Sequence, residues 1–344
     1  MTILITGATG LIGTALSKRL LDQGHTIHFL TTRKQKIINT PTHKGYYWNP
    51  TLQEIDLSAF TDVSCIVNLV GATIAKRWTP AYKKIVMSSR VETTNLLYKS
   101  LKELNHGVTS FISASGISLY PSADSAVYTE TSKEVAVNFL GEVVVVWEAA
   151  ADKFKDLGIG VAKIRTGVVF DSSQGAFPKM IQPIKMGVPS VVGDGSQWIS
   201  WIHTDDIVAI YNHAIDHNLT GIYNAVAPVA IKNTEFTKLV AGFYKIPMWA
   251  PNIPGFILKL FLGAMSMLAL QGQLVSVLKL EGTGFTFKYP TLDKALSNLL
   301  KKPHCILYYH NTPNDFCTLF SLENKYFVNF NNFKKEQIPF LIKK

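Results

Sequence analysis

Short apolar runs alternate with amphipathic helical patterns along the first half of the chain. The strand-like runs are residues 3–6, 26–31, 65–69, 109–114 and 160–165, and the helical patterns are residues 11–23, 80–104 and 135–156. Strands and helices that alternate in this way are joined by right-handed crossovers, which produce a parallel sheet with helices on both faces. The pattern therefore predicts a doubly wound α/β fold.

The pattern changes in the second half of the chain. Residues 167–195 are rich in Gly and Pro and are predicted to form a loop, before a helix that follows His203 and a strand at 221–225. Beyond this strand the pattern is helical, with Asn233 as the expected N-cap of one helix and Pro254 near the first turn of another. We expect a smaller, mainly helical C-terminal lobe beside the sheet.

A glycine-rich loop connects the first strand to the first helix. Its sequence is Gly7-Ala8-Thr9-Gly10-Leu11-Ile12-Gly13. A side chain at these glycines would hold a pyrophosphate away from the backbone N–H groups and from the positive end of the helix. Between a strand and an amphipathic helix, this spacing predicts a Rossmann domain that binds a dinucleotide. The contacts expected here are Gly7, Thr9, Gly10, Leu11, Ile12 and Gly13.

The end of the second strand indicates which dinucleotide is bound. It reads Thr31-Thr32-Arg33-Lys34, with no acidic residue to accept hydrogen bonds from the ribose hydroxyls of NAD(H). Arg33 can meet a 2′-phosphate bidentately, while Thr32 donates a hydroxyl and Lys34 adds charge. We therefore expect NADP(H) rather than NAD(H). The alternative is that these cations belong to a solvated loop face.

Composition and charge narrow the class of protein. The 344 residues are 47% hydrophobic and 17% charged, as in a globular chain, and carry a formal net charge of +10. This charge favours anionic partners, which a phosphate-rich cofactor satisfies, and no nucleic-acid-binding signature accompanies it. We expect a small-molecule substrate and no nucleic-acid partner, and leave open a homodimer.

Cysteine usage and the N-terminus indicate the compartment. The three cysteines, Cys65, Cys305 and Cys317, have no metal-ligand spacing, so neither a disulfide framework, a zinc site nor another metal is expected. A strand-like Thr2-Ile3-Leu4-Ile5 at the start leaves no room for a signal peptide. The prediction is a cytoplasmic protein.

One apolar stretch, residues 253–270, raises the question of a membrane. Lys259 interrupts it and Pro254 and Gly255 stand at its start, so a buried or partner-facing helix is the better interpretation than stable membrane insertion. Attachment of this stretch to a membrane surface is a third, weaker hypothesis.

Several further motifs follow the glycine loop in chain order. They are Asn68-Leu69-Val70-Gly71-Ala72, Arg77-Trp78-Thr79, Ser89-Arg90-Val91, Phe111-Ile112-Ser113-Ala114-Ser115, Arg165-Thr166-Gly167-Val168-Val169, residues 193–203 with Asp205-Asp206, and residues 284–290. With these motifs the chain resembles the extended short-chain dehydrogenase/reductase superfamily, and more closely an atypical branch called epimerase-family or YfcH-like proteins. The resemblance spans residues 1 to about 300.

The resemblance implies a core that binds NADP(H) and a C-terminal lobe that forms the substrate pocket. By family position, Gly71 and Ala72 lie along the cofactor after the fourth strand, and Ser113 and Ala114 lie at the fifth. Further cofactor contacts are expected from Leu69, Arg90 and Arg165. A strand that ends in small residues lets a dinucleotide lie across the carboxyl edge of the sheet, which agrees with part of this assignment. Arg90 could equally face an anionic substrate or form a surface ion pair.

The catalytic pair of the superfamily is missing. Its enzymes use a Tyr as acid/base, whose pKa a Lys four residues later lowers, but those positions hold Phe139 and Val143. The substitutes we would test are Tyr120 as acid/base, Ser115 as hydrogen-bond donor and Glu142 as a displaced acid. Each also has a simpler interpretation, as a packing residue, a cofactor contact and a helix surface charge respectively.

Aromatic residues follow the Gly/Pro-rich loop. Trp198, Trp201 and His203 could line a pocket for a planar substrate, or pack within the protein. His203 near a helix start is more often a hydrogen-bonded structural residue than a titrating one.

We expect three parts in the chain and weigh two functions. Residues 1–232 are the predicted NADP-binding domain, with 171–202 contributing to the substrate cleft, 233–302 the helical substrate lobe, and 303–344 an atypical tail to which we assign no role. The first hypothesis is an NADP(H)-dependent oxidoreductase or epimerase-like enzyme that acts on a small molecule with a carbonyl or hydroxyl group. The alternative is a catalytically silent NADP(H)-binding sensor or scaffold, because fold and cofactor do not fix a reaction.

Overall fold

The computed structural model of the protein describes residues 1–300 and the backbone of three short strands in the tail. These strands are β15 Cys305–Tyr309, β16 Cys317–Ser321 and β17 Phe327–Asn329, and they pair antiparallel in that order. The rest of the predicted tail lies outside the described residues. Contacts divide the chain into two compact units, Met1–Ala295 and Leu296–Lys344. The boundary predicted between residues 232 and 233 falls inside the first unit.

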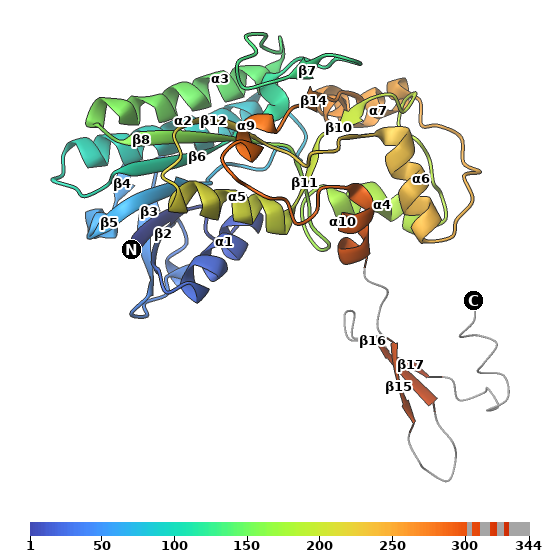
Figure 1. Ribbon diagram of the computed structural model, residues 1–344, viewed down its shortest axis with the longest axis horizontal. Helices are drawn as coiled ribbons and strands as arrows, with labels where there is room; N and C mark the ends of the chain where they lie inside the picture. Colours follow the sequence, from blue (N-terminus) through green and yellow to red (C-terminus); the bar gives the residue numbers. More distant parts are fainter. Residues whose placement is uncertain (301–304, 310–316, 322–326, 330–344) are drawn as a thin grey trace. The chain divides into compact units, whose positions relative to one another are not determined.

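An eight-stranded sheet forms the centre of this unit (Figure 1). The strand order is β12-β8-β6-β5-β1-β2-β3-β4, and all neighbours are parallel except β3 and β4. The strands are β1 Thr2–Thr6, β2 Thr26–Thr31, β3 His43–Asn49, β4 Glu54–Ile55, β5 Val63–Asn68, β6 Ser110–Gly116, β8 Gly160–Thr166 and β12 Gly221–Ala225. The chain winds outward from β1 in both directions, which confirms the doubly wound Rossmann fold and puts the switch point between β1 and β5.

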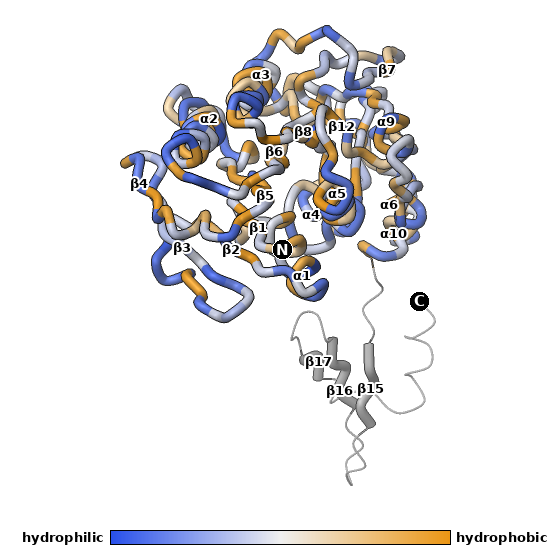
Figure 2. Tube along the Cα trace, turned by 60° about the vertical axis from the view of Figure 1, so that its left-hand side comes forward, coloured by the Kyte–Doolittle hydropathy of each residue, from blue (hydrophilic) through white to orange (hydrophobic). Residues whose placement is uncertain are grey.

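Helices cover both faces of the sheet (Figure 1). The helices α1 Leu11–Asp22 and α5 Thr204–Asp216 lie on one face, and α2 Pro80–Lys102 and α3 Phe139–Asp152 on the other. Side chains alternate along a strand, so Ile3 and Ile5 of β1 pack with Leu16 of α1, while Leu4 packs with Leu97 of α2. Burial on both faces explains why the strands read as continuous apolar runs, and Figure 2 shows hydrophobic segments gathered along them.

The C-terminal region is mainly helical, as the sequence predicts, and short helices and strands from the middle of the chain accompany it. The helices are α4 Phe177–Lys185, α6 Asn233–Phe243, α7 Gly255–Leu262, α8 Met267–Leu270, α9 Leu278–Glu281 and α10 Leu292–Leu299. The short strands are β7 Val127–Tyr128, β9 Val168–Phe170, β10 Trp198–Ile199, β11 Trp201–His203, β13 Ile231–Lys232 and β14 Leu274–Val275. They pair two by two, as β10 with β13, β11 with β9, and β14 with β7.

Some predicted boundaries are wrong. The segment 167–195, predicted as a loop, contains β9 and the helix α4. The sequence argues against this helix because Pro178 lies in its first turn and Pro183 lies inside it. The helix α3 begins at Phe139 rather than at residue 135, because the Asn138 side chain accepts hydrogen bonds from the next turn and caps the helix. The N-cap of α6 is Lys232 rather than Asn233.

The apolar stretch 253–270 is broken into short helices at Gly263, where φ is +58°. None of the helices in the described part of the chain is long and apolar enough to cross a membrane. No residue of α7 is buried, and Phe256, Leu260 and Phe261 are each at least 70% exposed. Of the two interpretations of this stretch, the buried helix is therefore wrong for α7, and the partner-facing helix stays a prediction.

Candidate functional site

The glycine loop lies tightly against the end of β5. Gly7 has φ +68°, and a Cβ added there would lie 2.9 Å from the carbonyl carbon and oxygen of Leu69. A Cβ at Gly13 would lie 2.2 Å from the Gly7 carbonyl oxygen, so the first turn of α1 packs directly on the loop. Both glycines are required by the close approach of backbone segments, as the sequence predicts for a dinucleotide loop.

The N-terminus of α1 is open to an anion. Gly10 is the N-cap residue, it provides no capping side chain, and the first turn holds no acidic residue. Thr9 and Gly10 are exposed, and Leu11 and Ile12 are partly exposed. The first N–H groups of a helix have no partner within it and carry partial positive charge. The arrangement can therefore receive a phosphate group at the switch point between β1 and β5.

The ends of β1 and β5 are joined by one hydroxyl group. Thr6 Oγ1 donates to Asn68 Oδ1 at 2.7 Å and accepts from the backbone N–H of Leu69 at 3.1 Å and of Val70 at 3.3 Å. Asn68 in turn donates to Thr94 of α2 at 3.0 Å. These bonds hold the backbone after β5 in place beside the glycine loop.

Gly71 and Ala72 continue from β5 and lie against α2. The Ser89 hydroxyl accepts from the Ala72 N–H at 2.9 Å, and Arg90 Nη1 donates to the Ala72 carbonyl at 3.2 Å and to the Val86 carbonyl at 3.0 Å. A Cβ added to exposed Gly71 would lie 2.9 Å from the Arg90 guanidinium carbon. The structure thus brings the predicted residues Leu69, Gly71, Ala72 and Arg90 together at the carboxyl end of β5.

Arg33 lies at the end of the neighbouring strand β2. Its side chain is exposed, and it forms no ion pair with any residue that the structure describes. The Thr31 hydroxyl accepts from the Arg33 N–H at 3.2 Å, Thr32 is exposed, and the Lys34 ammonium stands 4.9 Å from the centre of the Tyr47 ring. These groups form a cationic end of β2 on the side of β1 away from β5.

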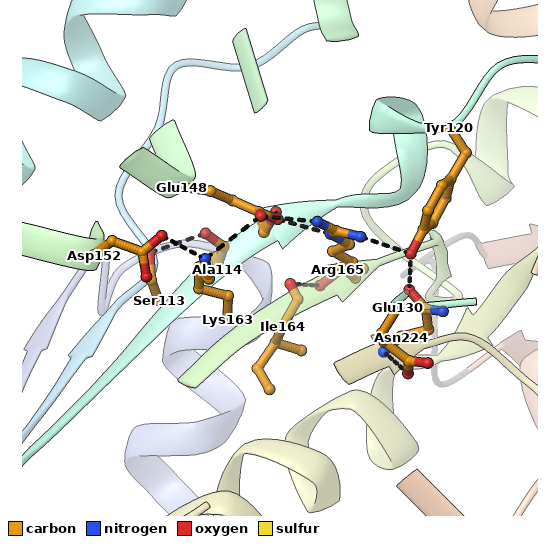
Figure 3. A network of polar contacts seen from close by, with 12 residues as sticks. Ser113, Ala114, Tyr120, Glu130, Glu148, Asp152, Lys163, Ile164, Arg165 and Asn224 are labelled. Carbon is orange, nitrogen blue, oxygen red and sulfur yellow. Dashed lines mark hydrogen bonds and ion pairs between the residues drawn. The ribbon is translucent and has the colours of Figure 1, made fainter. Parts of the chain in front are cut away.

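A buried network of polar side chains lies between α3 and the sheet (Figure 3). Glu148 receives two hydrogen bonds from Arg165, at 2.8 and 2.9 Å, and one from Ser115 at 2.6 Å. Arg165 also donates to the Tyr120 hydroxyl at 2.8 Å, which donates to Asn224 Oδ1 at 2.9 Å. We call the set the buried network, with the partly exposed Glu130 and Asp152 at its margins; it consists of Ser115, Tyr120, Glu130, Glu148, Asp152, Lys163, Arg165 and Asn224.

The charges of the buried network stabilise one another. Burial alone would raise the pKa of Glu148, but the hydrogen bonds and charge of Arg165, with help from Ser115 and Lys163, outweigh burial and lower it. Burial would likewise lower the pKa of Arg165, but Glu148 outweighs it and raises that pKa. Both groups are therefore ionised at neutral pH.

Of the residues suggested as substitutes for the missing catalytic pair, Ser115 and Tyr120 belong to the buried network, and Glu142 lies apart from them. Burial raises the pKa of Tyr120, whose side chain is 0% exposed and whose hydroxyl is already held by Arg165 and Asn224. Ser115 gives its single proton to Glu148, so it has none for a substrate oxygen. Glu142 is exposed in the first turn of α3 and lines a separate hollow between α2 and residues 135–139. The catalytic roles of these residues stay predictions, and the geometry favours their simpler interpretations.

The positions of the missing pair are apolar in space as well as in sequence. Phe139 packs edge-on against Trp78, with ring centres 5.3 Å apart, and Val143 is 3% exposed. The Lys83 ammonium stands 5.0 Å from the centre of the Phe139 ring. Neither Phe139 nor Val143 can exchange a proton.

Two predicted cofactor contacts, Arg165 and Ser113, donate their hydrogen bonds to acceptors within the protein. Arg165 belongs to the buried network, and Ser113, which is 1% exposed, donates to the Ala114 carbonyl at 3.0 Å. Ala114 is partly buried beside Ser113 on β6. The sequence could not reveal the partner of Arg165, because Glu148 precedes it by 17 residues and lies on another element.

The aromatic residues proposed as pocket walls pack within the protein. Trp201 is 0% exposed, stacks on Phe170 and donates to the Val229 carbonyl at 3.0 Å. His203 is 3% exposed and caps α5 by accepting from the Asp205 N–H. The centre of its ring lies 3.9 Å from the centre of the Tyr289 ring. We therefore assign both to packing. Trp198 is partly buried and donates to the Asp124 carbonyl at 2.8 Å.

Known families match two parts of the chain. Residues 3–153 match the NAD dependent epimerase/dehydratase family, and residues 253–299 match a domain of unknown function, DUF1731. An epimerase family protein of Staphylococcus haemolyticus is 34% identical over 300 residues, which cover 86% of this chain and 98% of that protein. A second one, of Staphylococcus epidermidis, is 35% identical over 301 residues, with coverage of 87% and 98%.

Solved structures show the same architecture. A human epimerase family protein with NADPH superimposes with a TM-score of 0.75 at 27% identity, over 88% of this chain and 100% of that chain. A nucleoside-diphosphate sugar epimerase from Corynebacterium glutamicum gives a TM-score of 0.70 at 29% identity, over 87% of this chain and 58% of that chain. MoeE5 in complex with UDP-glucuronic acid and NAD, at 18% identity and a TM-score of 0.69, shows the fold alone.

Proposed function

The chain belongs to the epimerase family of the short-chain dehydrogenase/reductase superfamily, and from that premise we propose that it binds NADP(H) and acts with it on a small molecule that carries a carbonyl or hydroxyl group. The observation that carries the proposal is the open N-terminus of α1, which is uncapped, free of acidic residues in its first turn, and placed at the switch point of the sheet.

The residues at this edge of the sheet fit a nicotinamide dinucleotide. The N–H groups of Thr9, Leu11 and Ile12 would bind the pyrophosphate, whereas the Gly10 N–H donates to the Gly7 carbonyl. Gly7 and Gly13 keep the loop close to the backbone of β5. Leu69, Gly71 and Ala72 would lie along the dinucleotide. When bound, the cofactor supplies hydride transfer, while the protein supplies binding and orientation.

The preference for NADP(H) rests on Arg33. This cation is exposed at the end of β2 and has no carboxylate partner in the described part of the chain, with Thr32 beside it and no acidic residue from 31 to 34. A 2′-phosphate would supply the missing anion through a bidentate pair. A relative crystallised with NADPH supports this preference.

The test is a titration of the full chain and of Arg33→Ala with NADPH and with NADH, followed by protein fluorescence. We expect the substitution to weaken NADPH binding about tenfold or more, the value of one charge-assisted contact, and to leave NADH binding within about twofold. The matched control is Arg19→Ala, which removes an exposed cation from the far end of α1 and should change neither affinity. Equal losses for the two nucleotides would overturn the preference for NADP(H), and no binding of either would overturn the proposed function.

A second candidate function is binding without turnover, as in a redox sensor or scaffold. It is favoured by the apolar Phe139 and Val143 and by the Ser115 proton, which is committed to Glu148. A screen of carbonyl compounds for consumption of NADPH by the loaded protein separates the two functions. Turnover supports the enzyme, whereas NADPH binding without turnover of any compound supports the sensor.

A further inference from the structure

Large apolar side chains are exposed on the helix α7 and on the segments that lead to it. Met186, Trp249, Phe256, Leu260 and Phe261 are each at least 64% exposed, and we call these five residues the apolar patch. Single apolar residues are ordinary on a protein surface, whereas a gathered set marks a surface that binds a partner. Keeping such side chains in water costs free energy, so we expect this surface to be covered.

The apolar patch lies on two segments that run side by side. The Trp249 indole N–H donates to the Gly187 carbonyl at 2.9 Å. Four residues later, the Ile253 N–H donates to the Val191 carbonyl at 2.8 Å, and the Ile253 carbonyl accepts from the Gly193 N–H at 2.9 Å. The chain enters α7 two residues after Ile253. These bonds join the segment 186–193 to the start of the exposed helix.

The exposed residues of α7 share one side of the helix. Phe256, Lys259 and Leu260 are three and four residues apart, which places them on one face, and the next residue, Phe261, widens it. Lys259 is exposed among these apolar side chains. Phenylalanine, leucine and tryptophan with a lysine beside them are typical of a helix at a membrane interface, where the lysine ammonium reaches the headgroups.

The charge around the apolar patch has one sign. Residues 172–193 contain two lysines, residues 236–280 contain four, and neither segment contains Asp or Glu. The Lys185 ammonium stands 5.8 Å from the centre of the Tyr244 ring, so the cations of one segment lie near the other. Lys185, Lys245 and Lys259 are exposed and form no ion pair with the described residues.

This combination favours one kind of partner. A second copy of the chain would bring the lysines of two patches together, with no carboxylate from these segments to pair with them. An anionic bilayer offers an apolar region to the side chains and negative headgroups to the lysines at the same time. We propose that the apolar patch docks the protein on the surface of an anionic phospholipid bilayer, with Lys185, Lys245 and Lys259 at the lipid phosphates.

The first experiment is flotation of the full chain with vesicles of phosphatidylcholine alone and of an equal mixture with phosphatidylglycerol. We expect binding to the mixed vesicles at about 0.1 M salt, weaker binding to the neutral ones, and a loss of binding at about 1 M salt. The double substitution Phe256→Ser/Phe261→Ser should weaken binding about tenfold or more, because two apolar side chains no longer leave water.

The matched control is Leu52→Ser, which replaces an exposed apolar residue in the turn between β3 and β4 and should keep full binding. Both serine variants change exposed side chains, so they should fold, and thermal unfolding without vesicles checks this.

The fluorescence of Trp249 reports which face meets the bilayer. Among the six tryptophans of the chain, all of them described, only Trp249 is exposed. Mixed vesicles with brominated acyl chains should therefore quench the wild type. Trp249→Phe keeps an aromatic ring, so it should still float with the vesicles but lose most of the quenching.

Several outcomes overturn the proposal. They are a wild type that binds no vesicles, equal binding to neutral and mixed vesicles, a double variant that binds as tightly as Leu52→Ser, and equal quenching of wild type and Trp249→Phe. Sedimentation equilibrium tests the second copy. A wild-type dimer that Phe256→Ser/Phe261→Ser dissociates, without vesicle binding, would assign the patch to self-association instead. None of these measurements uses NADP(H), so they stand apart from the test of the proposed function.

Discussion

At the scale of single residues, Glu148 shows how a buried charge is tolerated in this fold. It receives hydrogen bonds from Arg165 and Ser115 and lies 3.7 Å from the Lys163 ammonium, so each of its oxygens has a partner. The sequence indicates none of this, because these residues lie on different elements and are joined only by the tertiary fold. The motif that contains Arg165 can be recognised in the sequence, but its partner Glu148 cannot.

The acid dependence of stability follows from the lowered pKa of Glu148. A carboxyl group whose pKa is lower in the folded than in the unfolded chain stabilises the fold above its ordinary pKa, here 4.5, and loses this contribution as the pH falls through the folded value. Glu148→Gln leaves Arg165 buried without its anion and should cost about 3–5 kcal/mol at pH 7. The difference between variant and wild type should shrink as the pH falls below 4.5.

Urea unfolding of both proteins from pH 7 down to about pH 3 measures this difference. Glu103→Gln, at an exposed carboxylate just after α2, is the control and should be near neutral throughout. A difference that stays constant over the pH range would show that Glu148 is not the ionised centre of the buried network.

At the scale of elements, the turn from β1 to α1 assigns different tasks to its glycines. A Cβ at Gly13 would lie 2.2 Å from the Gly7 carbonyl oxygen, whereas a Cβ at Gly10 would lie 3.3 Å from the same oxygen, with the side chain at the open helix end. Gly13 thus serves the packing of the loop, and Gly10 leaves room for a ligand.

Substitutions at the two glycines should therefore separate stability from binding. Gly13→Ala should lower the free energy of unfolding by about 1–3 kcal/mol through overpacking. Gly10→Val should leave the protein folded but abolish dinucleotide binding. Thermal unfolding and NADPH titration of both variants check this. Retained NADPH affinity in Gly10→Val would show that no phosphate approaches the loop there.

Elements were predictable where the apolar pattern is long and regular. The strands β2 and β12 match their predicted ranges, and β2 reads as an apolar run next to turn residues. The strand β3, His43–Asn49, was missed because its sequence HKGYYWN has no aliphatic run. The helix α4 was missed because its two prolines argue locally against a helix, and tertiary packing of Phe177, Ile181 and Ile184 prevails.

At the scale of the whole molecule, the net charge of +10 bears on ligand binding. A cationic protein attracts an anionic nucleotide, and salt screens this attraction. The Debye length, over which charges are felt, falls from about 10 Å at 0.1 M to about 3 Å at 1 M salt. NADPH carries one phosphate more than NADH. Its affinity should therefore be the more sensitive to salt.

Titration of both nucleotides at about 0.1 M and about 1 M salt measures this sensitivity. We expect NADPH to lose more affinity than NADH in wild type, and Arg33→Ala to reduce the difference. The same salt response for both nucleotides in wild type would mean that the extra phosphate meets no cation of the protein.

The sequence predicts some parts of the candidate site and not others, as it does for the elements of the fold. The glycine loop is local, so its spacing and its place after a strand were sufficient to predict it. The pairing of Arg165 with Glu148 and the occupied hydroxyl of Tyr120 depend on which side chains surround them in space. Short motifs carry no information of that kind.

The paired bonds between Glu148 and Arg165 also constrain how this gene can diverge. A mutation of either codon leaves a stranded charge in the interior, whereas an exchange of both for apolar residues of similar volume is tolerated in principle. A lineage therefore crosses between the two solutions only by linked changes, and descendants that have lost the arginine should have lost the glutamate too.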